Sequence, residues 1–313
     1  LRIKADALGV ESEDFEADKV NISDLYTGIH NLKVSGTKMA EFHQQGQVTL
    51  EEGSFFANQF VVLEDENNPS QSLYGYYDQD LKSVKSLNKS MGNIWGVSPR
   101  NMEQTFALWA LLNENIKLVT LTGGAGTGKT LLAIAAGLSK STDEDVYSRL
   151  LIARPIVALG KDIGYLPGDI DEKLNPWMQP VYDCLDFLLG VQSSPRQKKG
   201  GNKSYQELIN QGMLAVEPLT YIRGRSLPQS FFVVDEAQNL TQHEIKTIIT
   251  RAGEGSKIVL TGDPFQIDNP YIDSTNNGLT HVVERFKGSA IAAHATLQQG
   301  ERSELATLAA EFL

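Results

Sequence analysis

Two patterns of apolar and polar positions divide the chain near residue 90. Between Lys19 and Lys89, short apolar or alternating runs are separated by polar breaks such as Ser35-Gly36. The runs that we expect to form strands are Lys19–Ile22, Ile29–Val34, Val48–Leu50, Phe60–Leu63 and Ser72–Tyr77. Strand-like runs bounded by turn residues predict a small antiparallel, β-rich module.

After Trp95-Gly96, buried strands alternate with amphipathic helices. The expected helices are Asn101–Asn113, Lys129–Ser139 and Gln242–Ala252. The expected strands are Ile116–Thr122, Leu150–Ala153, Met213–Glu217, Ser230–Val234 and Lys257–Leu260. Apolar strands separated by helices are typical of a parallel sheet that is covered on both faces. We therefore expect an α/β fold with a parallel sheet flanked by helices, preceded by the β-rich module.

These patterns predict a connector over residues 1–18, the β-rich module over 19–90 and an α/β domain over 91–313. The module contains no residues that suggest chemistry, so it is either a structural spacer or a small unit that grips nucleic acid. A basic, Gly/Ser-rich loop is expected at Gln192–Ser204. Because the sequence begins with Leu1, we expect it to be an excised piece of a longer polypeptide.

The composition restricts the classes of protein to consider. With 313 residues and a net charge of −11, the chain is unsuited to coating nucleic acid by bulk electrostatics, although a local basic channel remains compatible. The single cysteine, Cys184, lies in an apolar run and is expected in the core of a protein from a reducing compartment. No apolar run reaches the roughly 18 residues of a membrane span, so we expect a soluble, cytoplasmic protein without a membrane partner.

The strongest chemical signal is GGAGTGKT at residues 123–130, which fits the phosphate-loop pattern and lies between an expected strand and an expected helix. Glycines allow successive backbone N–H groups to converge on a phosphate at a helix N-terminus. The Lys129 ammonium would neutralise the β- and γ-phosphates, and the Thr130 hydroxyl would bind Mg²⁺. The residues expected to contact the nucleotide are Gly123, Gly124, Ala125, Gly126, Thr127, Gly128, Lys129 and Thr130. The alternative is a glycine-rich turn without a ligand.

Two acidic residues follow another strand, in the run SFFVVDEAQN. In a parallel sheet this position lies at the carboxyl edge, where the phosphate loop also lies. Asp235 would hold Mg²⁺, and Glu236 would act as the general base that polarises the attacking water. Alone, such a pair could merely cap the next helix. The sequence therefore predicts a magnesium-dependent P-loop NTPase whose catalytic residues include Lys129, Thr130 and this acidic pair.

Two glutamines are candidates for sensing and base recognition. Gln266 follows the strand in KIVLTGDPFQID, where a neutral amide could contact the γ-phosphate or its attacking water; it could also be a turn residue held by Pro264. Gln104 lies about one helix before the phosphate-loop strand, and its amide could bond the edge of adenine. ATP is therefore the expected nucleotide.

Several of these segments together resemble the PhoH-like ATPase family, which is related to superfamily 1 helicases. They are DEAQN, GDPFQID, YIRGRSL at 221–227 and the long run ARPIVALGKDIGYLPGDIDEKLNPWMQPVYD at 153–183. The resemblance extends from about Trp95 to the end. It implies ATP-driven work on single-stranded RNA and a homo-oligomeric ring, a hexamer. The preceding region is similar to the part of two-domain PhoH proteins that follows a PIN ribonuclease domain, so the resemblance implies that domain in the full-length chain.

Five arginines complete the set of candidates. Arg154, Arg223 and Arg225 are expected to contact RNA, unless they pair with carboxylates of this acidic protein. Arg302 opens the C-terminal segment ERSELATLAAEFL and is the candidate arginine finger, supplied in cis or in trans; it could instead pair with neighbouring glutamates on the surface. Arg251 is the second choice.

Other functions remain open from the sequence. A P-loop kinase is one alternative, although Gln266 fits helicase-like sensing better. A GTPase is disfavoured because no N-K-x-D motif follows the acidic pair. The third alternative is a scaffold whose assembly is gated by nucleotide and that performs no work on nucleic acid.

Overall fold

The computed structural model describes Val20 and residues 25–50, 53–68, 70–87, 92–157, 170–192, 205–222 and 224–300. Side chains within the helix at 170–192 are described for residues 176–190. The expected connector, most of the strand at Lys19–Ile22 and nearly all of the loop at Gln192–Ser204 lie outside the described residues. Arg223 and Arg302 also lie outside them.

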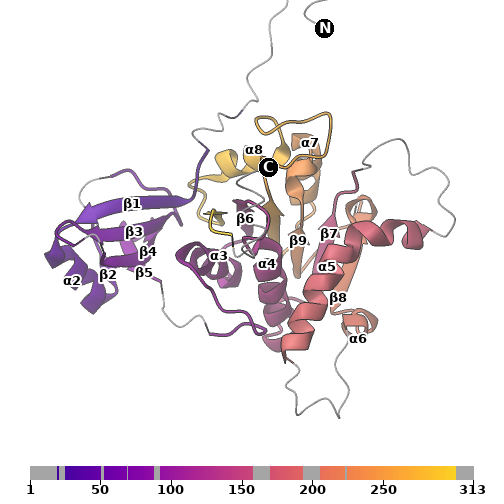
Figure 1. Ribbon diagram of the computed structural model, residues 1–313, viewed down its shortest axis with the longest axis horizontal. Coiled ribbons are helices and arrows are strands. Elements are labelled where there is room, and N and C mark those ends of the chain that lie inside the picture. Colours follow the sequence, from indigo (N-terminus) through magenta and orange to yellow (C-terminus); the bar gives the residue numbers. More distant parts are fainter. Residues whose placement is uncertain are drawn as a thin grey trace, which may run out of the picture.

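A six-stranded sheet organises the larger part of the chain (Figure 1). Its order is β11-β6-β10-β9-β7-β8, and every neighbouring pair is parallel. The strands are β6 (Leu118–Gly123), β7 (Arg149–Arg154), β8 (Leu214–Pro218), β9 (Ser230–Val234), β10 (Lys257–Gly262) and β11 (Ala292–Leu297). The expected α/β fold with a parallel sheet is confirmed. All carboxyl ends of the strands therefore lie at one edge.

Helices cover both faces of this sheet because the side chains of each strand alternate between the faces. On β9, Phe231 and Val233 pack into the cluster formed with α3 (Met102–Leu112), α4 (Lys129–Leu138) and α5 (Ile170–Gln192). Phe232 and Val234 pack into a second cluster, formed with α7 (Gln242–Ile249) and α8 (Gly278–Phe286). A short helix, α6 (Tyr205–Asn210), precedes β8. The result is a three-layer arrangement with a fully buried β9 near its centre. Among the described helices, none combines the length and apolar character needed to span a bilayer.

A smaller, five-stranded sheet forms the N-terminal module, in the order β1-β3-β4-β5-β2 (Figure 1). Its elements are β1 (Ile29–Val34), α2 (Gly36–Gln45), β2 (Gln47–Val48), β3 (Phe60–Asp65), β4 (Ser72–Asp78) and β5 (Ser83–Ser86). The expectation of an antiparallel module is wrong for one pair, because β1 and β3 are parallel. Helix α2 begins directly after β1 and carries the chain away before β3, which makes a parallel pairing possible.

The module packs on the large sheet through an aromatic cluster. Phe60 of β3 stacks on Phe106 of α3 at a centroid distance of 4.5 Å, and Tyr76 of β4 lies 4.2 Å from Trp109. The opposite face of the small sheet packs on α2, whose Phe42 is buried. The two sheets are therefore joined by a continuous apolar core on the α3 side.

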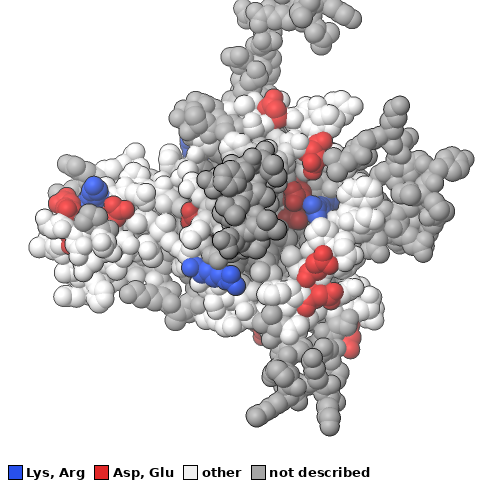
Figure 2. Space-filling model, viewed as in Figure 1, with Lys and Arg blue, Asp and Glu red and all other residues white. Residues whose placement is uncertain are grey.

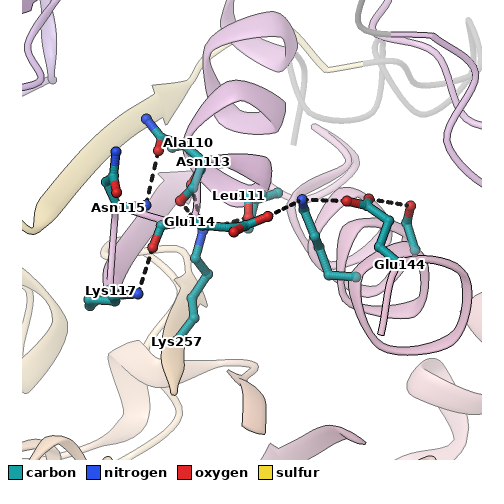
Figure 3. A network of polar contacts seen from close by, with 10 residues as sticks. Ala110, Leu111, Asn113, Glu114, Asn115, Lys117, Glu144 and Lys257 are labelled. Carbon is teal, nitrogen blue, oxygen red and sulfur yellow. Dashed lines mark hydrogen bonds and ion pairs between the residues drawn. The ribbon is translucent and has the colours of Figure 1, made fainter. Parts of the chain in front are cut away.

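The C-terminal end of α3 is bound by a buried lysine of β10 (Figure 3). The Lys257 ammonium donates to the carbonyl oxygens of Ala110, Leu111 and Asn113 at 3.0, 2.6 and 2.8 Å. A helix leaves its last carbonyl groups without intrahelical partners, and a cation there is favoured by the helix dipole. Burial acts in the opposite direction and lowers the pKa of Lys257 to about 7.

Candidate nucleotide site

The phosphate loop connects the end of β6 to the start of α4, as the sequence predicts. Gly123, Gly126 and Gly128 have φ of 143°, 79° and 90°, in the range that favours glycine. At Gly123 a β-carbon would lie 1.9 Å from the carbonyl oxygen of Leu297, so no larger residue fits where β11 runs beside the loop. The helix N-terminus at Lys129 then faces the loop and can receive an anion.

The side chain of Lys129 lies over this loop. Its ammonium donates to the carbonyl oxygens of Gly123 and Gly124 at 2.6 and 2.8 Å, and the Thr127 hydroxyl also donates to the Gly124 carbonyl at 2.9 Å. Lys129 is 9% exposed. A buried ammonium group beside the phosphate loop supplies positive charge that can neutralise phosphate oxygens.

Asp235 follows β9 and is bound by two hydroxyl groups from neighbouring elements. Thr130 Oγ1 of α4 and Thr261 Oγ1 of β10 each donate to Asp235 Oδ1 at 2.7 Å. The Asp235 backbone N–H donates to the carbonyl of Ala153 on β7 at 2.9 Å. The structure therefore brings together Thr130 and Asp235, the two residues that the sequence predicts as Mg²⁺ ligands.

This donor set fits a magnesium ion that is shared with phosphates. Mg²⁺ prefers oxygen ligands and is commonly held by one or two carboxylates together with substrate phosphates and waters. The Thr130 hydroxyl and the Asp235 carboxylate supply such oxygens beside the phosphate loop. Among the described residues, no group of three or more His, Cys, Asp or Glu side chains forms an all-protein metal site.

Glu236 adopts φ 55° and ψ 38°, a left-handed conformation that is uncommon outside glycine and is often found at functional sites. Its Oε1 lies 3.2 Å from Nη2 of Arg154, and its Oε2 accepts from Nε2 of Gln238 at 2.5 Å. Burial, followed by the charge of Asp235, raises the pKa of Glu236 above its usual value, while Gln238, Arg154 and Lys129 oppose this shift. A carboxylate of raised basicity next to a phosphate loop suits a general base.

The loop that carries Gln266 is held against the acidic pair by Gln238, which is fully buried. The Gln238 amide donates to the Gln266 carbonyl at 2.9 Å and accepts from the Asp263 backbone N–H at 3.1 Å. At Gly262 a β-carbon would lie 2.3 Å from the Gln238 side chain, so a glycine is needed there. The Gln266 side chain itself is exposed. Its proposed contact with the γ-phosphate stays a prediction.

Gln104 lies near the start of α3 and is 5% exposed. Its Nε2 donates to the Thr127 carbonyl of the phosphate loop at 3.1 Å, and its Oε1 accepts from the Arg100 backbone N–H at 2.9 Å. A primary amide has a second hydrogen and a second lone pair, so these bonds leave capacity for adenine. The neighbouring Glu103 accepts from the backbone N–H of Gln298 at 2.7 Å, which attaches the segment after β11 to the same helix.

Two of the described candidate arginines, Arg154 and Arg225, are paired with carboxylates, which is the alternative that the acidic composition suggested. Arg154 pairs with Glu236, and Arg225 Nη1 lies 2.5 Å from Oε2 of Glu217. Arg251 lines a cavity of about 380 Å³ at the carboxyl edge of the sheet, together with Pro155 and other residues. The expected role of Arg302 cannot be placed in this geometry because Arg302 lies outside the described residues.

Three residues of the site were not singled out from the sequence. Gln238 connects the acidic pair to the Gln266 loop, Thr261 binds Asp235, and Asn239 accepts from the backbone N–H of Asp268 at 2.7 Å. The signal for all three was present in DEAQN and LTGD. Polar side chains just past two neighbouring buried strands are expected to meet at the carboxyl edge.

Comparison with known proteins shows the family to which the chain belongs. A family model described as PhoH-like protein matches residues 96–311. The whole chain is 51% identical to Protein PhoH2 of Bacillus subtilis and covers 70% of that protein. It is 36% identical to Protein PhoH2 of Mycolicibacterium smegmatis, again over the whole chain, and covers 68% of it.

A shorter match joins the chain to the PhoH-like protein of Bacillus subtilis, at 37% identity over 55% of this chain and 49% of that protein. Among solved structures, the Pif1 helicase from Candida albicans aligns over 65% of this chain and 40% of its own, with 15% identity and a TM-score of 0.31. A likeness of that size has no bearing on function.

Proposed function

Because the chain belongs to the PhoH-like family, we propose that it hydrolyses ATP with Mg²⁺ and couples this reaction to the binding and remodelling of single-stranded RNA. The observation that carries the ATPase proposal is the hydrogen bond that the Thr130 hydroxyl donates to the Asp235 carboxylate at 2.7 Å. It connects the phosphate loop, which follows β6, to the acidic pair, which follows β9, and β10 lies between these two strands.

The proposal gives each side chain a role. Lys129 and the loop N–H groups bind the β- and γ-phosphates and neutralise charge that spreads over the γ-oxygens in the transition state. Thr130 and Asp235 hold Mg²⁺, which supplies Lewis-acid polarisation of the phosphate oxygens when bound. Glu236 accepts a proton from the attacking water, and Gln266 contacts the γ-phosphate or that water. Gln104 recognises adenine.

RNA is the proposed nucleic-acid partner because of the family resemblance and the basic residues at the carboxyl edge. On the face shown in Figure 2, the coloured basic side chains are few, and some of them lie beside acidic ones. With a net charge of −11, binding through a few local phosphate contacts is more plausible than binding through a broad basic surface. Arg154 and Arg225 are the described candidates, and Arg223 is the third.

The same proposal includes assembly and a further domain. A homo-oligomeric ring, a hexamer, would allow Arg302 to act as an arginine finger in trans, and a PIN ribonuclease domain would belong to the full-length chain. Sedimentation velocity with ATP-Mg tests the ring directly. The competing functions are a P-loop kinase and a scaffold whose assembly is gated by nucleotide.

The first prediction concerns ATP turnover by the wild type and by Lys129→Ala, each measured with and without poly(U). We expect Mg²⁺-dependent turnover that rises with poly(U), and a loss of about 100-fold or more in Lys129→Ala, because charge-assisted contacts to a transferring phosphoryl group supply several kcal/mol. Removal of Mg²⁺ with a chelator should abolish turnover in both proteins.

Lys117→Ala is the matched control, because Lys117 lies on the exposed surface just before β6 and should leave turnover unchanged. Near-normal hydrolysis in Lys129→Ala would remove the phosphate loop from the mechanism. If poly(U) does not bind and does not change turnover, while assembly still depends on nucleotide, the scaffold function would be favoured.

A further inference from the structure

The two acidic residues, Asp235 and Glu236, are bonded on different sides of β9. Asp235 is bonded to Thr130 and Thr261, which belong to α4 and β10. Glu236 is bonded on the other side, to Arg154 at the carboxyl end of β7. In the sheet order β11-β6-β10-β9-β7-β8, β7 lies on the side of β9 that is away from β6 and its phosphate loop.

Both oxygens of the Glu236 carboxylate are engaged in this arrangement. Arg154 binds Oε1 at 3.2 Å, and Gln238 binds Oε2 at 2.5 Å. The Arg154 guanidinium is itself fixed by a second bond, from Nη1 to the Trp177 carbonyl of α5 at 3.3 Å. The candidate base is therefore held toward β7 by a positioned cation.

This ion pair is accessible to a ligand. The side chains of Arg154 and Glu236 are 20% and 35% exposed, so solvent and a charged ligand can reach the pair. Partly exposed ion pairs are weak, whereas an arginine binds a phosphate through two parallel hydrogen bonds. A single phosphate at this position can therefore replace Glu236 as the partner of Arg154.

A cavity of about 380 Å³ lies at the same edge of the sheet, and its lining includes Pro155, the residue after Arg154, but neither Arg154 nor Glu236. Apolar side chains form part of its wall, and the polar or charged residues that also line it are Thr220, Asn239, His243, Glu244, Thr247, Arg251 and Asn269. Within the described part of the chain, Nε of Arg251 is buried without a hydrogen-bond partner. Apolar surface together with polar groups suits an unstacked nucleobase.

We propose that Arg154 is a positioning residue that holds Glu236 away from the phosphate loop, and that a backbone phosphate of single-stranded RNA releases Glu236 by taking the Arg154 guanidinium while a base enters the adjacent cavity. This inference rests on the proposed function, in which Glu236 is the general base and RNA is the partner. RNA binding then raises the rate of hydrolysis without contributing any group to the reaction.

The decisive variant is Arg154→Gln, which keeps a donor for the Trp177 carbonyl but removes the charge. Turnover without RNA should rise by about five- to tenfold, because releasing a weak ion pair corresponds to roughly 1 kcal/mol. Poly(U) should give no further stimulation, and its binding should lose about one unit of salt slope. Arg154→Lys should restore low turnover without RNA and part of the stimulation.

The matched control is Arg149→Ala, at the opposite end of β7, where Nε contacts Ser230 Oγ at 3.3 Å. It should behave as the wild type in every assay. ATP-Mg binding measured by isothermal titration, equal in all variants, excludes misfolding as the cause of a change.

The proposal is overturned if Arg154→Gln binds ATP-Mg normally but its turnover without RNA is equal to or below that of the wild type. Persistent stimulation of Arg154→Gln by poly(U) also overturns it, while leaving the proposed ATPase function intact. Stimulation of the wild type by poly(dT) and not by poly(U) would overturn the assignment of RNA. Absence of hydrolysis in the wild type would instead contradict the proposed function itself.

Discussion

Gln238 connects the two loops that carry the acidic pair and Gln266. Its amide bonds the Glu236 carboxylate, the Gln266 carbonyl and the Asp263 backbone N–H, and it is fully buried. A buried amide with three partners from two loops fixes one loop relative to the other. A change at the γ-phosphate that moves the Gln266 loop would therefore also move Glu236.

Gln238→Met tests this connection, because methionine has a similar size but offers no hydrogen bonds of this kind. We expect turnover to fall by about tenfold with ATP-Mg affinity retained. Stability should fall by about 1–3 kcal/mol, because the buried Asp263 N–H and the partly buried Gln266 carbonyl lose their partner. The measurements are steady-state turnover, isothermal titration and urea unfolding. Gln179→Met, which removes only an exposed bond to Asp183 on α5, is the control. Unchanged turnover in Gln238→Met would show that the two loops act independently.

At the residue scale, the sequence identified residues of the site more successfully than it identified the contacts between them. The motif at 123–130 and the Asp235-Glu236 pair could be identified because their spacing and their place after strands are distinctive. The pairing of Arg154 with Glu236 could not, since it depends on β7 lying beside β9, and strand order is not written in a local pattern. The same holds for Thr261, whose hydroxyl meets Asp235 only because β10 is the other neighbour of β9.

At the scale of elements, α3 is fixed at both ends. Its N-cap, Asn101, accepts from the Gln104 backbone N–H, and the Gln104 side chain bonds the phosphate loop. Its C-terminal carbonyls are bound by Lys257 (Figure 3). A second lysine, Lys140, pairs with Glu114 and Glu144 nearby, at 2.9 and 2.6 Å. The buried cap therefore helps to position the helix that contacts the nucleotide loop.

Lys257→Met should lower the free energy of unfolding by about 2 kcal/mol, because buried carbonyl groups at the end of α3 lose their donor. The result can be checked by urea unfolding at neutral pH. Lys117→Met is the control, since the Lys117 side chain is exposed and donates to the Glu114 carbonyl at 2.7 Å in the same region. We expect a change within about 0.5 kcal/mol. A Lys257→Met protein as stable as the wild type would mean that water or relaxation satisfies the helix end.

Most elements of the large sheet could be predicted because they are apolar runs that end at turn residues. The strand at Ser230–Val234 was predicted with its observed bounds, and that at Lys257–Leu260 is two residues short of β10. β11 was not predicted, since AAHATL mixes small and polar residues. Its burial depends on packing beside β6 and on the buried His294. The short α2 was missed because its sequence, GTKMAEFHQQ, has only two buried positions.

At the scale of the whole molecule, His294 lies where the two sheets meet. Its ring bonds the hydroxyls of Thr120 and Thr296 at 2.8 and 3.0 Å, and a β-carbon at Gly28 of the module would lie 2.0 Å from its carbonyl oxygen. Burial lowers the pKa of His294 to about 4. The neutral imidazole is therefore the form that the folded protein accepts.

This shift predicts a loss of stability in acid. In the unfolded chain, His294 binds a proton as pH falls below the ordinary histidine pKa of 6.5, whereas in the folded chain it does so only near pH 4. The free energy of unfolding therefore falls as pH falls from 6.5 to about 4. The contribution is about 3 kcal/mol. Urea unfolding of the wild type and of His294→Asn between pH 7 and pH 4 should show a shallower slope in the variant. His43→Asn, on the exposed face of α2, should keep the wild-type slope. Equal slopes in all three proteins would contradict a buried, neutral His294.

The division into a module over 19–90 and a domain over 91–313 stays a prediction. The aromatic cluster of Phe60, Phe106 and Trp109 and the bonds from Asn58 Nδ2 to the carbonyls of Ala290 and Ala292 join the two sheets. The pattern of apolar and polar positions located a boundary between two parts of the chain near residue 90. It carried no information on how much surface the two parts bury against each other. That information depends on which aromatic residues face outward from each sheet.

The central claim is that Glu236 activates the attacking water while Asp235 holds Mg²⁺. The most direct test measures ATP-Mg affinity and turnover on the same preparations of Glu236→Gln and Asp235→Asn. The account predicts that Glu236→Gln binds ATP-Mg as the wild type does and hydrolyses it about 100-fold more slowly, and that Asp235→Asn loses the magnesium-dependent part of its affinity. Wild-type turnover in Glu236→Gln, or equal ATP-Mg affinity in both variants, would contradict it.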